Sequence, residues 1–198
     1  MVRLRHAPPT ARSATAQRQV ALLHEFQDIL ARDGMADMEE YGDMLKWALP
    51  SRDGWCRYFH AYDPSFCSFS DAFRGTVHDH GGTIRGTVLI GHIRHQTYEA
   101  TPDADGDRVW AGQPVTLQRH AQDQPEGTEY ELAPHVAHWP VPTTLTVTYF
   151  EEEDNGVMGE LVDPIDGVHD EQPWTQETAD AWSPTLRAAI EARLAALR

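Results

Sequence analysis

Between Trp55 and Phe150 the chain consists of short runs of β-branched and aromatic residues, each ended by Gly, Pro or Asp. Runs of this kind are typical of strands. No helical periodicity interrupts them, which argues against a parallel α/β fold, because that fold needs a helix between successive strands. Many short strands in succession predict an all-β core that closes into a barrel or a double-sheet jelly roll. The strands are expected at Trp55–Tyr62, Phe66–Phe73, Thr76–His80, Thr83–Ile90, Ile93–Glu99, Val115–Arg119, Thr128–Leu132 and Thr143–Phe150.

Helical patterns lie on both sides of this region. Apolar residues recur at helical spacing from about Thr15 to Arg32 and again from about Ala36 to Ala48. A C-terminal helix is expected over residues 183–198, with Ser183 as N-cap and Pro184 at the first helical position. The length of 198 residues predicts a single domain, with residues 15–50 as a helical N-terminal extension and residues 55–150 as the barrel.

Composition excludes several classes of function. The 31 acidic residues outnumber the 16 basic ones, and the net charge of −15 disfavours binding to nucleic acid. No apolar stretch approaches the roughly 20 residues that cross a bilayer, and the N-terminus lacks the apolar segment of a secretory signal. We therefore expect a cytoplasmic protein that binds no membrane. The sequence carries no signal for an oligomeric state.

The segment His78-Asp79-His80 is the strongest indication of chemistry. Side chains alternate along a strand, so both imidazoles of a His-x-His pair point to the same side. Two neutral imidazoles on one face are the beginning of a metal site. A thiolate zinc site is not indicated, because the two cysteines, Cys56 and Cys67, form no Cys-x-x-Cys pair.

A third ligand must come from a distant segment, and His135 and His138 are the candidates. They are three residues apart, so they cannot both face inward from one extended segment. His92 and His95 flank the turn at Gly91 and are expected to be solvated. The other five histidines are isolated in the sequence and are given no role: His6, His24, His60, His120 and His169.

The stretch from Val77 to Gly91 resembles the first metal motif of the cupins, and its HDH form resembles the thiol dioxygenase branch, the cysteine dioxygenase-type enzymes. In many cupins a glutamate ligand follows the second histidine, and Ile84 stands at that position here. The resemblance therefore implies a site of three histidines without a carboxylate. It covers roughly Trp55 to Phe150 and places His135 at the position of the third ligand, so that His78, His80 and His135 would hold the metal.

The same resemblance implies Fe(II), O2 and a small thiol carboxylate such as cysteine or 3-mercaptopropionate as the reactants. Arg57 matches the arginine that binds the substrate carboxylate in the cysteine enzymes. Tyr149 is a candidate hydrogen-bond donor to bound oxygen. The last strand of these enzymes normally carries a histidine near the iron, whereas this sequence has Thr148 in that strand and no histidine.

Two other functions fit the same residues. The first is a cupin isomerase or lyase that uses Zn, Mn or Ni as a Lewis acid. The second is a non-catalytic cupin that binds a small molecule. A sensor of that kind would carry a DNA-binding element, and neither expected N-terminal helix has the basic surface that such an element needs.

Overall fold

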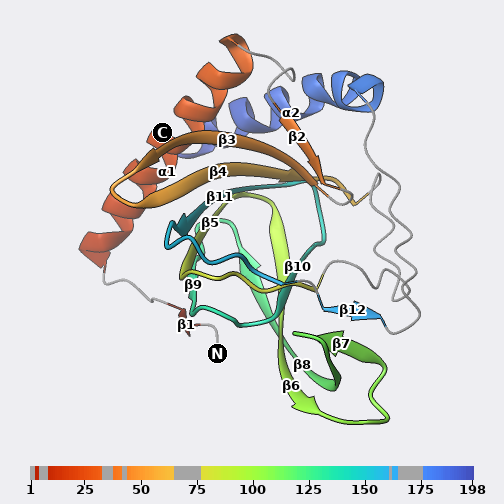
Figure 1. The fold of residues 1–198 in the computed structure, drawn as a ribbon. Helices are drawn as coiled ribbons and strands as arrows, with labels where there is room; N and C mark the ends of the chain where they lie inside the picture. Colours follow the sequence, from red (N-terminus) through yellow and green to blue (C-terminus); the bar gives the residue numbers. More distant parts are fainter. Residues whose placement is uncertain are drawn as a thin grey trace.

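The computed structural model describes residues 3–4, 9–32, 38–41, 44–64, 77–160, 162–164 and 176–198. Two antiparallel sheets form its core, and two helices flank them (Figure 1). The elements in chain order are β1 (Arg3–Leu4), α1 (Pro9–Arg32), β2 (Met38–Tyr41), β3 (Met44–Arg52), β4 (Trp55–Tyr62), β5 (Ile84–Ile90), β6 (His92–Pro102), β7 (Arg108–Trp110), β8 (Gln113–Pro125), β9 (Glu129–Leu132), β10 (His138–Pro142), β11 (Thr146–Glu153), β12 (Asp163–Pro164) and α2 (Gln176–Ala196).

The seven-stranded sheet has the order β1-β9-β5-β11-β4-β3-β2, and the five-stranded sheet has the order β10-β6-β8-β7-β12. The two sheets share an apolar interior, in which Ile84, Val88 and Phe150 of the larger sheet pack with Ile93 of the smaller one. The expected all-β jelly-roll core with a C-terminal helix is confirmed, and the first of the two expected N-terminal helices is present as α1.

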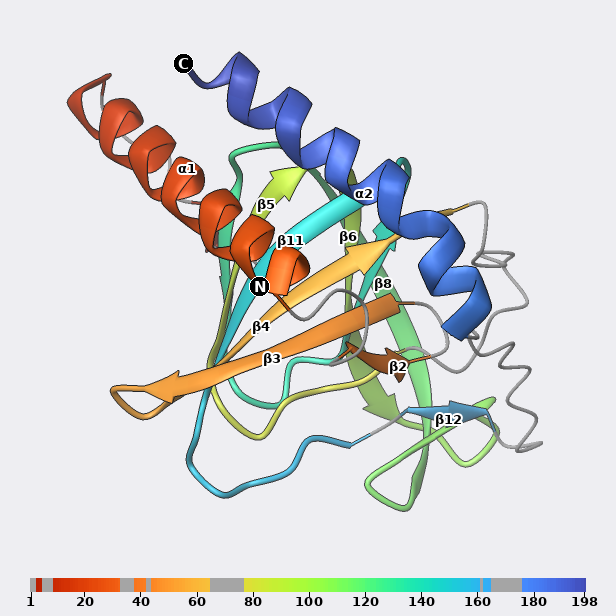
Figure 2. The same ribbon diagram turned by 90° about the horizontal axis from the view of Figure 1, so that it is seen from above.

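The larger sheet buries both of its faces against different partners. Figures 1 and 2 show α1 and α2 lying across its outer side, over β3, β4 and β11. Phe26 of α1 stacks on Phe59 of β4 at 4.5 Å and meets Trp47 of β3 edge-on at 5.0 Å. Tyr58, the neighbour of Phe59, packs instead with the interior cluster. Strand alternation therefore assigns each residue of β3, β4 and β11 either to the helices or to the interior.

The expected helix over Ala36 to Ala48 is wrong where the structure describes this segment, because β2 and β3 occupy it. Leu45 and Trp47 are fully buried under the helices, whereas Lys46 between them lies over the Tyr58 ring on the other face. This period of two suits a strand that pairs with β4. Tertiary pairing has outweighed a helical spacing of apolar residues.

Other element bounds also differ from expectation. The C-terminal helix begins at Gln176, so Pro184 lies inside it and Ser183 is not its N-cap. The expected strand Thr76–His80 is reduced, within its described residues, to a single bridge at His78, and β10 was not expected at all. The expected strand Phe66–Phe73 lies outside the described residues. Within the described part of the chain, neither helix has the length and apolar character needed to span a bilayer.

Candidate metal centre

Three histidines converge between the sheets. His78, His80 and His138 each offer a ring nitrogen, and these nitrogens lie within 4.8 Å of one another. His78 and His80 reach the same side because Asp79 between them faces the opposite way. The buried Asp79 carboxylate there accepts a hydrogen bond of 2.6 Å from the backbone amide of Glu160. The His-x-His expectation about side-chain direction is thus confirmed.

His138 joins this pair through the backbone. His78 and His138 form an isolated antiparallel bridge, with reciprocal amide-to-carbonyl hydrogen bonds of 3.1 and 2.8 Å. Residues directly opposite each other in an antiparallel pair project their side chains to the same face. The bridge therefore places the His138 ring beside the His78 ring, with their centroids 4.6 Å apart.

His135 is not part of the cluster, so the sequence-based choice of His135 over His138 is wrong about the geometry. His135 has a φ of +57°, and its side chain is 57% exposed. Its Nδ1 lies 3.3 Å from an Asp79 carboxylate oxygen, on the side of the segment that faces away from the three rings. The left-handed conformation turns the chain here, three residues before the bridge brings His138 opposite His78.

A buried hydrogen-bond chain determines which nitrogen of His138 is available. The amide oxygen of Gln124 lies 3.3 Å from Nδ1 of His95, and Nε2 of His95 lies 2.7 Å from Nδ1 of His138. The amide oxygen can only accept, so His95 carries its proton on Nδ1 and accepts at Nε2. Burial lowers the pKa of His95 to about 4, which keeps it neutral at pH 7. His138 therefore donates from Nδ1 and leaves a lone pair on Nε2.

Glu152 fixes His80 in the same way. A Glu152 carboxylate oxygen lies 3.1 Å from Nδ1 of His80. Burial raises the pKa of Glu152, but the hydrogen bond from His80 and the charge of Lys46 lower it by more, so that the net shift is downward. Glu152 is thus a carboxylate that accepts the Nδ1 proton, and His80 also presents a lone pair on Nε2.

These two lone pairs face each other, because Nε2 of His80 and Nε2 of His138 are 3.1 Å apart. Two unprotonated ring nitrogens at this distance repel each other unless a proton or a metal ion lies between them. Nitrogens bonded to one ion at about 2.0–2.1 Å and at right angles are about 3 Å apart. The residues present therefore fit a metal ion, held by neutral imidazoles without a carboxylate. Such a donor set suits Fe, Ni, Cu or Zn and leaves coordination positions open.

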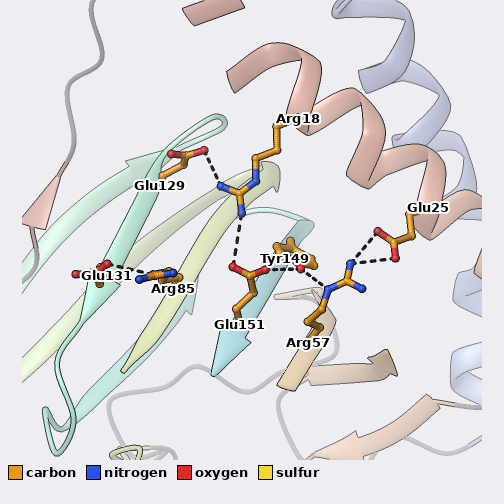
Figure 3. A network of polar contacts seen from close by, with 8 residues as sticks. All are labelled: Arg18, Glu25, Arg57, Arg85, Glu129, Glu131, Tyr149 and Glu151. Atoms are coloured by element: carbon orange, nitrogen blue, oxygen red, sulfur yellow. Dashed lines mark hydrogen bonds and ion pairs between the residues drawn. The ribbon is translucent and has the colours of Figure 1, made fainter. Parts of the chain in front are cut away.

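Arg57 and Tyr149, the two expected catalytic residues, contact each other but lie on the outer face of the sheet (Figure 3). Arg57 Nε donates to the Tyr149 hydroxyl at 2.6 Å, and the Arg57 guanidinium pairs with Glu25 of α1 at 3.1 Å. Phe150 and Glu152 alternate with Tyr149 along β11 and point to the opposite, interior face, where they contact His80. The structure does not bring Arg57 or Tyr149 to the histidine cluster.

Two histidines that were given no metal-site role prove to be buried near the cluster. His95 has no exposed surface and orients His138, although the sequence indicated a solvated turn. His60 is buried on the interior face of β4, and its Nδ1 lies 3.3 Å from the Tyr62 hydroxyl. Alternation along β4 could have signalled this position, because the apolar Phe59 and Ala61 on either side of His60 point to the opposite face.

Comparison with known proteins finds no matching family model and no matching curated protein. Among solved structures, an RmlC-like cupin from Shewanella frigidimarina matches with a TM-score of 0.38 and 16% identity, over 59% of this chain and 84% of that one. Oxalate decarboxylase from Bacillus subtilis gives a TM-score of 0.41 and 10% identity, over 63% of this chain and 29% of that one. Salicylate 1,2-dioxygenase from Pseudoaminobacter salicylatoxidans gives a TM-score of 0.42 and 9% identity, over 73% of this chain and 37% of that one. At such TM-scores these likenesses carry no argument about function.

The hydrogen bond from His138 to His95 leads to a prediction. We expect His95→Ala to weaken Co(II) or Zn(II) binding by about 10- to 100-fold, as is usual when the partner that orients a metal-binding histidine is removed. His95→Gln keeps an acceptor and should recover part of the affinity. Competition with a chromogenic chelator measures this, with His92→Ala as the matched control, since His92 bonds Thr143 near the sheet edge. Equal affinities for His95→Ala and His92→Ala would contradict the prediction.

Proposed function

We propose that this chain is a cupin-type metalloenzyme that uses Fe(II) and O2 to oxidise a small thiol carboxylate, in the manner of the thiol dioxygenases. The observation that carries the proposal is the interior cluster of three imidazoles, in which Nε2 of His80 and Nε2 of His138 lie 3.1 Å apart. Three neutral ligands leave room for an anionic substrate and put no protein charge on the ion. The HDH segment supports the thiol dioxygenase type.

When bound, an Fe(II) ion would supply redox chemistry toward dioxygen and open positions for a substrate. The chain's own residues prepare the site for this. His95 and Gln124 hold the His138 ring, and Glu152 holds the His80 ring, so the nitrogens meet without reorganisation. Phe150, whose ring lies 5.3 Å from that of His80, joins the apolar interior and helps to exclude water from the reactants.

Oxygen consumption tests this function. Protein purified without oxygen and loaded with Fe(II) is mixed with cysteine, 3-mercaptopropionate, other small thiols and a set of diketones. We expect one O2 to be consumed per thiol carboxylate, with both oxygen atoms recovered in a sulfinate. His138→Ala, loaded in parallel, should consume none above the background of free iron. No uptake by wild-type protein with any thiol would contradict the proposal.

A Lewis-acid isomerase or lyase at the same histidines is the second candidate. It is favoured by one observation, namely that the interior face of β11 presents Thr148 and Phe150 and no histidine. Elemental analysis of protein expressed in minimal medium separates the two candidates. Iron supports the dioxygenase, whereas zinc, manganese or nickel together with no oxygen uptake supports the isomerase or lyase.

A further inference from the structure

A row of polar side chains crosses the interior wall of the larger sheet. Lys46 of β3 is the register partner of His60 of β4, and His60 is the register partner of Thr148 of β11. Residues in register on adjacent strands have side chains about 5 Å apart on one face. The three side chains therefore form a continuous line from β3 to β11.

Each member of the row faces the interior. The Lys46 ammonium lies 4.0 Å from the centre of the Tyr58 ring, and Tyr58 packs with the interior cluster. The His60 ring lies 5.0 Å from that of Phe150, an interior residue that also contacts His80. Thr148 precedes Phe150 by two residues and shares its face. The row thus lies on the same side of the sheet as the three-histidine cluster.

Two polar atoms of the row have no hydrogen-bond partner among the described residues. They are Nε2 of His60 and Oγ1 of Thr148, and both are buried. A buried polar atom without a partner costs about 1–3 kcal/mol, so most such atoms in proteins are satisfied. Two of them at paired register positions indicate a ligand that completes them.

The chemistry of the row selects an anion. The Tyr62 hydroxyl can donate to Nδ1 of His60, which places the proton of the neutral ring on Nε2 as a donor. Burial first, and then the charge of Lys46, lower the pKa of His60 well below its ordinary value, so the ring is neutral. With the Thr148 hydroxyl and the Lys46 ammonium, the row offers three donors and one positive charge, which is the complement of a carboxylate.

We propose that Lys46, His60 and Thr148 bind the carboxylate of a substrate whose other end reaches the three-histidine cluster. This inference rests on the proposed function, since it assigns the carboxylate of the thiol carboxylate to residues of this chain. These residues take the role that the resemblance gave to Arg57, which instead contacts Glu25 and Tyr149 on the outer face. Lys46 also acts on Glu152, whose pKa it helps to lower, and a purely structural Lys46–Glu152 pair is the competing account.

Ligand binding to the zinc-loaded full chain tests the inference without any turnover. Calorimetry compares 3-mercaptopropionate with 2-mercaptoethanol, which keeps the thiol and lacks the carboxylate. We expect wild-type protein to bind 3-mercaptopropionate at least tenfold more tightly. Lys46→Met should remove that preference by weakening the carboxylate ligand at least tenfold, while 2-mercaptoethanol binds as before. His60→Phe and Thr148→Val should each reduce it several-fold. Arg57→Met is the matched control and should keep the full preference.

The outcomes separate this inference from the proposed function. If wild-type protein binds neither thiol, the proposed function fails and the inference fails with it. If wild-type protein prefers 3-mercaptopropionate and Lys46→Met and His60→Phe keep that preference, the inference is overturned and the function stands. Loss of the preference in Arg57→Met instead would also overturn it. Lys46→Gln is a second variant that also removes the charge and should lose the preference as Lys46→Met does. Urea unfolding of each variant shows whether a lost preference reflects lost folding.

Discussion

Replacing His138 by alanine is expected to abolish retention of metal, whereas replacing His135 by alanine should leave it intact. His138 provides one of three clustered nitrogens, while the His135 side chain is 57% exposed and bonds Asp79. Loss of a ligand should exceed the roughly 10- to 100-fold loss that follows removal of an orienting partner. Metal content after loading with Zn(II), desalting and elemental analysis measures the difference, with His78→Ala expected to behave like His138→Ala.

His135→Ala is the matched control for this experiment, because it lies in the same segment and removes the same ring. Its cost in stability should be small, since the His135 side chain is exposed and the buried Asp79 carboxylate keeps its hydrogen bond from the Glu160 amide. His138→Ala leaves Nε2 of the buried His95 without its donor, so urea unfolding of the metal-free variant must confirm that it folds. A metal-free His135→Ala beside a metal-bound His138→Ala would reverse the assignment.

The metal-free protein should lose stability as the pH falls from 6.5 towards 4. Burial lowers the pKa of His95 to about 4 and lowers the pKa of His60 well below its ordinary value. A histidine with a lowered folded-state pKa stabilises the fold above its unfolded pKa of about 6.5, and this contribution is lost as acid protonates the unfolded chain preferentially. His95 alone should cost about 2 kcal/mol between pH 7.5 and pH 5, and His60 adds a loss of the same sign.

Urea unfolding in the presence of a chelator, at several pH values from 7.5 to 5, measures this effect. His95→Gln carries no proton that titrates here and should show a shallower pH dependence than wild-type protein, even if it is less stable at pH 7.5. His120→Gln removes an exposed histidine and serves as the control, expected to keep the wild-type slope. Parallel pH curves for wild-type protein and His95→Gln would count against the buried neutral His95.

The sequence predicted two of the three clustered histidines, His78 and His80, for a local reason. The direction of His78 and His80 depends only on strand alternation across Asp79, which is visible in three residues. The choice between His135 and His138 depends on a bridge between segments 60 residues apart, from His78 to His138, and on the turn at His135. No local pattern records that bridge.

The same distinction explains the errors in the fold. The strands of the core have strong local signals, and most of them were predicted near their observed bounds. The segment that forms β3 has a helical spacing of apolar residues, and only its pairing with β4 shows that Leu45 and Trp47 belong to one face. Arg57 was matched by resemblance to an arginine that binds the substrate, although it lies two residues before the outward-facing Phe59 and so shares its face under α1.

The alternation of β4 has a consequence for how this chain tolerates change. Arg57 and Phe59 hold the helices, while Tyr58 and His60 line the interior, so one strand serves two unrelated tasks by odd and even positions. Insertion or deletion of a single residue within β4 would exchange the two sets and bury a guanidinium between the sheets. Length variation in this protein should therefore be confined to its turns, and β4 should accept changes of side chain but none of length.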